Sequence, residues 1–139
     1  MGAEDIAEEL RVAVGRFVRA TRAHADTLPP ARAAAMGLLG REGPRTIAWL
    51  AERHGVRHQS MSRIVGELES LGYVTRVANP SDARGFVIGL TAAGEAALDA
   101  DRAARRARVA TAIETRLTPA ERAILQAVPA LLDRLAADD

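Results

Sequence analysis

Apolar residues recur at helical spacing near both ends of the chain. Over residues 4–25 they follow one another in steps of three or four, which predicts an amphipathic helix. Near the other end, Thr118-Pro119-Ala120-Glu121 forms a capping box and predicts the start of a last helix. The two apolar sets are Ile6, Leu10, Val14, Phe17 and Val18, and Ile124, Leu125, Val128, Leu131, Leu132 and Leu135. Such stripes need a covering surface, from a partner subunit or, for some members, from the same subunit.

Between these ends the pattern changes from helical spacing to a short β-type alternation. Thr46 is a suitable N-cap for a helix, and Gly55 and Gly72 fall where helices end. Turn-forming residues fill 78–85 between two stretches rich in β-formers, so we expect a hairpin with a long, exposed tip. The expected elements are helices at 31–40, 47–54 and 57–71, strands at 73–77 and 86–90, and a helix at 91–116. This order predicts a mainly α fold with a small β-hairpin wing, a winged helix-turn-helix.

The amino-acid composition excludes several classes of function for this chain. The chain has 139 residues, which suits a single domain, and 48% of them are hydrophobic, which is ample for a core. It has no cysteine, so disulfides, thiol redox sensing, Cys nucleophiles and Cys-ligated metal sites are excluded. The acidic N-terminus lacks the features of a signal peptide, and the longest apolar run, residues 33–40, is too short to span a bilayer. We therefore expect a soluble cytoplasmic protein.

The sequence lacks the motifs of catalysis and of cofactor binding. It has no Gly-rich phosphate loop, and the Gly55 turn separates His54 from His58, so these two histidines need not share a helix face. The acidic pairs Glu8-Glu9 and Asp138-Asp139 lie near the termini, where they are expected to be solvated. We expect neither an enzyme nor a cofactor or metal site.

The predicted helix at 57–71 has one apolar and one polar face. At 100° per residue, the core side would carry Met61, Ile64, Val65, Leu68 and Leu71. The opposite side would carry Gln59, Ser62, Arg63, Gly66 and Ser70. Hydrogen-bonding groups among small residues suit a helix that enters the major groove, because Arg can pair with guanine and Gln with adenine. The alternative is the ordinary solvated side of an amphipathic helix.

Positive charge gathers around this helix, although the formal net charge of the chain is only +1. Residues 53–66 contain three arginines, two histidines and no acid, and Arg76 and Arg84 add charge on the hairpin. Such clustering can neutralise DNA phosphates, and an arginine at the tip of a wing can sense the width of the minor groove. Asp82 could hold Arg84 in position by a charge-assisted bond, or form a local salt bridge that stiffens the turn.

Short motifs run from residue 46 to residue 94. They are Thr46, Leu50-Ala51-Glu52-Arg53, Gly55-Val56, Ser60-Met61-Ser62-Arg63, Leu68-Glu69, Leu71-Gly72-Tyr73-Val74, Arg76, Asn79-Pro80-Ser81-Asp82-Ala83-Arg84 and Leu90-Thr91-Ala92-Ala93-Gly94. This stretch resembles the MarR family of bacterial transcriptional regulators, and the helical pattern outside it also fits. Two positions depart from the family pattern: Arg57 replaces a Ser or Thr cap, and Ala83 stands where a second Arg is frequent.

The resemblance implies a homodimer in which residues 1–28 and 95–139 form dimerisation helices and residues 30–94 form the DNA-binding region. Two such regions would read a pseudo-palindromic operator, about one DNA turn apart. Family members are typically released from DNA by small aromatic or anionic ligands. The implied DNA contacts are Arg53, Arg57, His58, Gln59, Ser60, Ser62, Arg63, Arg76, Asp82 and Arg84, and the ligand candidates are Phe17, His24, Met36, Leu39 and Trp49.

The expected function is therefore that of a transcriptional repressor that binds double-stranded DNA in a sequence-specific manner and associates with the nucleoid in that way. No membrane partner is expected. The alternative is a winged-helix module that binds another protein and no DNA. Such modules often lack a polar groove-reading face and a basic wing, and this sequence has both.

Overall fold

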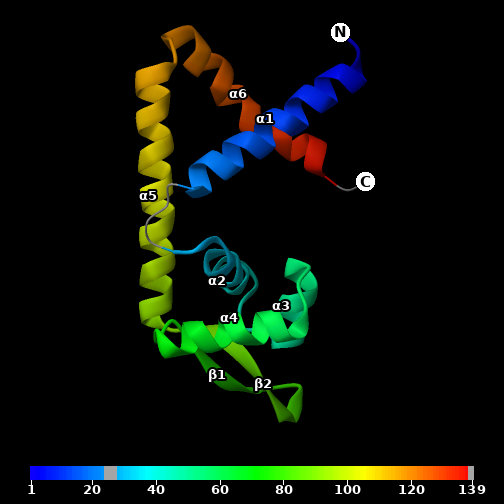
Figure 1. The fold of residues 1–139 in the computed structure, drawn as a ribbon, viewed down its shortest axis with the longest axis vertical. Coiled ribbons are helices and arrows are strands. Elements are labelled where there is room, and N and C mark those ends of the chain that lie inside the picture. Colours follow the sequence, from blue (N-terminus) through cyan, green and yellow to red (C-terminus); the bar gives the residue numbers. More distant parts are fainter. Residues whose placement is uncertain (24–27, 138–139) are drawn as a thin grey trace. The chain divides into compact units, whose positions relative to one another are not determined.

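The computed structural model describes residues 1–23 and 28–137, and the chain divides into two compact units, Met1–Arg105 and Arg106–Asp139. Figure 1 labels the elements, which are α1 (Ala3–Ala23), α2 (Pro30–Glu42), α3 (Ile47–His54), α4 (His58–Ser70), β1 (Val74–Asn79), β2 (Asp82–Leu90), α5 (Ala92–Arg116) and α6 (Pro119–Ala136). The predicted mainly α fold with a small hairpin is confirmed. No helix in the described part of the chain is long and apolar enough to cross a membrane.

Local signals fix the ends of the helices. The Thr46 hydroxyl accepts a hydrogen bond from the Trp49 N–H at 3.0 Å and caps α3, and Gly55 ends α3 with φ +74°. In the second unit, the Thr118 hydroxyl accepts from the Glu121 N–H while the Glu121 carboxylate accepts from the Thr118 N–H. This hydrogen bond from Thr118 lowers the pKa of Glu121. The helix starts predicted at these two threonines are confirmed.

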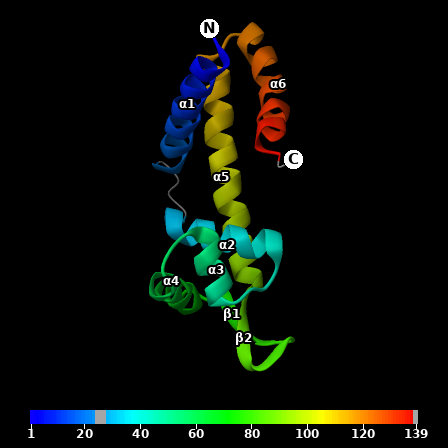
Figure 2. The same ribbon diagram turned by 90° about the vertical axis from the view of Figure 1, so that its right-hand side faces the viewer.

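The core of the first unit lies where α2, α3, α4 and the hairpin meet (Figure 2). Its fully buried members include Met36, Leu50, Met61, Leu68 and Ile88. The predicted apolar face of α4 is confirmed at Met61, Ile64, Val65 and Leu68.

Leu71 differs from the expectation that it faces the core. Its side chain is 47% exposed, because α4 ends at Ser70 and Gly72 turns the chain with φ +76°. The core side of the helix is thus completed by the chain that follows, where the Tyr73 N–H donates to the Leu68 carbonyl at 2.9 Å. A period of 3.6 residues predicts a face only while the helix continues.

The hairpin is longer and its turn is tighter than predicted. Only Pro80 and Ser81 separate β1 from β2, so the expectation of a long loop over 78–85 is wrong. The Asn79 side-chain oxygen accepts from the Ser81 N–H at 3.0 Å and closes the turn, which lets the flanking residues pair. The register passes from the Ala78–Phe86 pair to the Asn79–Asp82 pair, so residues 83–85 have no partners in β1 and form an irregular bulge.

Two backbone contacts join the hairpin to the rest of the first unit. Arg45 pairs with Ile88 through hydrogen bonds of 3.1 and 2.7 Å, which adds a one-residue bridge beside β2. At the open end of the hairpin, the Thr91 N–H donates to the Tyr73 carbonyl at 3.0 Å, and the Thr91 hydroxyl accepts from the Gly94 N–H. Gly94 is buried against the Tyr73 backbone so closely that a Cβ atom would collide with that carbonyl.

Candidate nucleic-acid interface

The polar face of α4 lies opposite its buried face. Gln59, Arg63 and Ser70 are exposed, while Ser62 and Gly66 are half-buried. Ser60 is half-buried in the first turn and His58 is exposed there. The structure therefore brings the predicted base-reading residues together on one surface of one helix, with the small residue Gly66 leaving open space beside it.

The start of α4 has no side-chain cap. Arg57 occupies the N-cap position with extended backbone angles, and its side chain makes no capping hydrogen bond. The free N–H groups of the first turn therefore point out of the helix with their partial positive charge. Such an end favours an anion such as a DNA phosphate, and the exposed guanidinium of Arg57 stands beside it.

Three of the predicted DNA-contacting arginines are unpaired. Arg57, Arg63 and Arg84 are exposed, and within residues 1–23 and 28–137 none of them forms an ion pair with a carboxylate. Arg53 is exposed as well, and its guanidinium carbon lies 6.0 Å from the centre of the Trp49 ring. Arg45, which the sequence reasoning did not select, lies nearer to the same ring, at 4.9 Å.

Arg76 and Asp82 both have hydrogen-bond partners within the protein. The Arg76 guanidinium is held by the Glu69 carboxylate at 2.9–3.1 Å and stacks over the Phe86 ring at 4.3 Å. The Asp82 carboxylate accepts from the Arg84 backbone N–H at 2.9 Å, and no ion pair joins it to the Arg84 guanidinium in the described residues. Asp82 therefore shapes the backbone of the bulge, and the Arg84 side chain is free to extend from it.

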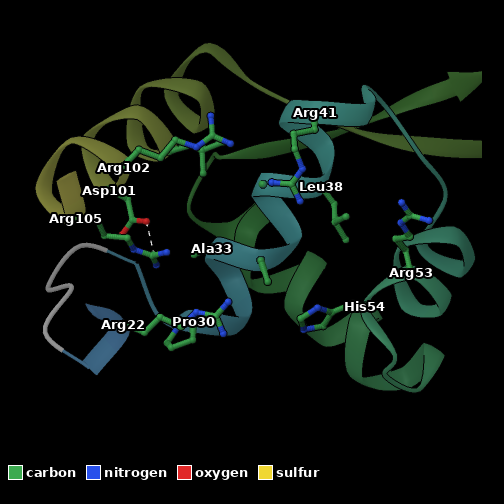
Figure 3. Close-up of a pocket in the computed structure, with 13 residues that line it drawn as sticks. Arg22, Pro30, Ala33, Leu38, Arg41, Arg53, His54, Asp101, Arg102 and Arg105 are labelled. Carbon is green, nitrogen blue, oxygen red and sulfur yellow. Dashed lines mark ion pairs between the residues drawn. The ribbon is translucent and has the colours of Figure 1, made fainter. Parts of the chain in front are cut away.

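A second candidate site is a hollow of about 260 Å³ beside α2, which we call the arginine pocket (Figure 3). Its ionisable lining residues are Arg22, Arg41, Arg53, His54, Asp101, Arg102 and Arg105. Asp101 is 1% exposed and pairs with Arg105 at 3.1 Å. The Nε atom of Arg105 is buried and has no hydrogen-bond acceptor among the described residues. Five guanidinium groups and one carboxylate thus border the pocket.

Among the residues that the structure describes, none of the ligand candidates chosen from the sequence lines this pocket. Met36 and Leu39 are buried in the core, and Phe17 is 54% exposed on α1. Trp49 is half-buried, and it borders a different hollow, between the start of α3 and the hairpin. His24 lies outside the described residues. The pocket was missed because its arginines come from four helices, and no local spacing marks them.

Comparison with known proteins agrees with this geometry. The sequence profile of the MarR family matches residues 26–85. An uncharacterised HTH-type transcriptional regulator of Mycobacterium bovis is 32% identical over 129 residues, which cover 91% of this chain and 90% of that protein. A similar uncharacterised regulator of Mycobacterium leprae is 32% identical over 115 residues, covering 81% and 78%.

Solved structures share the whole fold. A crystal structure described as that of a transcriptional regulator from Pseudomonas aeruginosa has a TM-score of 0.85 at 28% identity and covers 97% of this chain and 95% of its own. Wild-type MarR from E. coli has a TM-score of 0.70 at 20% identity and covers 99% and 98%, which shows the likeness of the fold. These relatives are transcriptional regulators and not enzymes. With its winged helix and the residues that match, the chain belongs to the MarR family of DNA-binding transcriptional regulators.

Proposed function

We propose that the protein is a homodimeric repressor that reads a pseudo-palindromic operator and leaves it when a small anionic ligand binds. The DNA-binding part of this proposal rests on positive charge that no acidic residue neutralises. Arg57, Arg63 and Arg84 are exposed without a carboxylate partner in the described part of the chain. A guanidinium that the protein leaves unpaired is available to phosphates and to guanine edges.

We assign each residue a role from its place on the winged helix. Gln59, Ser62 and Arg63 face outward from α4 and would read base edges in the major groove. Arg84 extends from the bulge of the wing and would enter the minor groove, with Asp82 fixing the backbone from which it extends. Arg53 and Arg57 would lie near the phosphate backbone, Ser60 would be a further major-groove contact, and His58 would be a further contact to DNA.

The dimer is supported by apolar side chains that the single chain leaves uncovered. No residue of α6 is buried, and Ile124 and Leu135 are 69% and 72% exposed. On α1, Ile6 and Phe17 are also exposed. A second copy that covers these stripes would bury them, and a two-fold axis would place two recognition helices on successive turns of DNA.

Arg63→Ala tests the assignment of α4 to the major groove. We expect the variant to lose about 1–3 kcal/mol of operator binding and to discriminate less between sequences, because a bidentate contact to guanine would be gone. The measurement is a mobility-shift titration with the DNA upstream of the protein's own gene and of adjacent genes, at several salt concentrations. Arg106→Ala, on the exposed surface of α5, is the matched control and should bind like the wild type.

Other outcomes of this titration have definite meanings. An equal loss on every DNA sequence would make Arg63 a phosphate contact. A wild-type protein that shows no salt-sensitive DNA binding would contradict the proposed function and favour the winged-helix module that binds another protein.

The arginine pocket supports an anionic rather than a neutral ligand. Five guanidinium groups border it, and its only carboxylate among the described lining residues already pairs with Arg105. A small carboxylate or phosphate would satisfy these donors, including the buried Nε atom of Arg105. Arg53 and His54 belong to α3, so a ligand in this pocket would contact the helix-turn-helix directly.

A thermal-shift screen with benzoate, hydroxybenzoates and inorganic phosphate checks the pocket. We expect at least one anion to raise the Tm, because a ligand present at 100 times its Kd stabilises the native state by about 2.7 kcal/mol. Arg102→Ala should abolish that rise, while Arg19→Ala, on an exposed position of α1, should keep it. An equal rise in Arg102→Ala, or none with any anion, would contradict the ligand assignment.

A further inference from the structure

We propose that Glu69, Arg76 and Phe86 form a clamp that fixes the angle between the hairpin and α4, and so sets the position from which Arg84 meets DNA. Arg76 is then a positioning residue rather than a phosphate contact. This inference rests on the proposed DNA-binding function, which it deepens by assigning the element that aligns the two DNA-reading surfaces.

The geometry joins three elements through one planar group. Arg76 lies on β1, and its Nε atom donates to both oxygens of Glu69, at 3.0 and 3.1 Å, while its Nη2 atom donates to Oε1 at 2.9 Å. Glu69 lies in the last turn of α4. The guanidinium carbon of Arg76 is 4.3 Å from the centre of the Phe86 ring on β2. The guanidinium is therefore held at its edge by the helix and on its face by the second strand.

The clamp lies where the hairpin leaves the body of the unit. On the body side of it Val74 is buried, and Ile88, which pairs with Arg76 across the hairpin, is buried and hydrogen-bonded to Arg45. Phe86 itself is 39% exposed, Val77 just beyond Arg76 is 45% exposed, and Figure 1 shows the hairpin extending away from α4. A two-stranded hairpin has little stability of its own. Its direction therefore depends on the last row of contacts with the body.

A small rotation of the hairpin at the clamp produces a large displacement at the tip. Arg84 lies four residues from Ile88 along β2, which corresponds to at most about 13 Å, because residues 83–85 belong to the bulge. A rotation of about 10° at Ile88 would move Arg84 by about 2 Å. Such a shift exceeds the range of distances over which a hydrogen bond is formed. An arginine that enters the minor groove therefore requires a fixed hairpin angle.

The solvent exposure of the Arg76–Glu69 ion pair indicates that the clamp positions the hairpin and adds little to folding stability. The side chains of Arg76 and Glu69 are 41% and 31% exposed, and ion pairs this accessible to water add little to folding stability. The forked pairing of a planar guanidinium with a carboxylate is nevertheless directional, which a lysine could not reproduce. Loss of the clamp should therefore affect DNA binding more than it affects the Tm.

If Arg76 were instead a phosphate contact, one substitution would change the affinity for DNA in the opposite direction. Glu69→Gln removes a negative charge from the end of α4. If Arg76 binds a phosphate, this change frees its guanidinium and strengthens DNA binding. If Arg76 acts through the clamp, the same change weakens binding although the protein becomes more positive.

The experiment measures operator affinity of Glu69→Gln in the wild-type and Arg84→Ala backgrounds. We expect a loss of about fivefold to twentyfold in the first background and almost none in the second, because the clamp acts through Arg84. Glu67→Gln is the matched control. It removes the same charge from the same helix, where Glu67 pairs with Arg32 at 3.3 Å, and it should not weaken binding. Tighter binding by Glu69→Gln, or an equal loss in both backgrounds, would overturn the proposal.

A second measurement needs no DNA and separates this inference from the proposed function. The chain has no cysteine, so Ala83→Cys offers one site for a nitroxide label near the tip of the wing. Electron paramagnetic resonance should show a more mobile label when Glu69→Gln is added, and an unchanged label with Glu67→Gln. Equal mobility in all three proteins would overturn the clamp. If the label becomes more mobile as expected but the wild type binds no DNA, the result supports the clamp and contradicts the proposed function.

Discussion

Gly94→Ala is expected to destabilise the winged domain by about 3 kcal/mol or more. The added Cβ atom would collide with the Tyr73 carbonyl, and this neighbour is backbone that cannot rotate aside as a side chain can. The same carbonyl accepts the Thr91 N–H, so moving it would also disturb the junction between the hairpin and α5.

Thermal unfolding followed by circular dichroism checks this expectation, and the Tm should fall by roughly 10 °C or more. Gly66→Ala is the matched control, because nothing lies within 4 Å of the position its Cβ would take. Since glycine is unfavourable inside a helix, the control should be stabilised by about 0.5–1 kcal/mol. If the Tm of Gly94→Ala equalled that of the wild type, the Tyr73 backbone would have to move away from the added Cβ atom at little cost, which would contradict this expectation.

Leu131→Asp is expected to convert the proposed dimer into monomers and to weaken operator binding by about a hundredfold or more. Leu131 lies on the same stripe of α6 as Ile124 and Leu135, and it is 50% exposed in the single chain. A carboxylate there would have to be buried unpaired in the proposed interface. Separate subunits would then bind half-sites without the gain from linkage, which commonly amounts to 10²–10⁴.

Sedimentation velocity gives the oligomeric state, and a mobility-shift titration gives the affinity. Ala130→Asp places the same charge on the other side of α6, at an exposed position, and should remain dimeric with unchanged operator affinity. If Leu131→Asp stayed dimeric, the apolar stripe of α6 would not form the interface.

Features that depend on neighbouring residues in the chain could be predicted from the sequence. The starts of α3 and α6 follow from Thr46 and Thr118, whose hydroxyls bind N–H groups three residues later. The buried and exposed faces of α4 follow from helical periodicity. The hairpin tip was less predictable, because turn-forming residues indicate where a chain turns and not how far the strands pair on either side.

Features that depend on tertiary contacts could not be predicted in this way. The pairing of Arg76 with Glu69 requires that α4 end at Ser70 and that β1 run back beside it. The arginine pocket requires side chains as distant in sequence as Arg22 and Arg105 to border one hollow. Neither arrangement has a characteristic spacing. Charge counting identified the arginines, and only the folded chain distinguishes those that are engaged from those that are free.

The bridge between Arg45 and Ile88 links the start of α3 to the wing. Arg45 directly precedes the cap of α3 and is bonded through its peptide groups to the wing, whereas Arg53 and His54 at the other end border the arginine pocket. A helix of eight residues is about 12 Å long and behaves as a stiff rod. An anion that draws Arg53 inward would rock this rod about its middle, and the far end would pull on the root of the wing. A signal could thus cross the domain along one short helix.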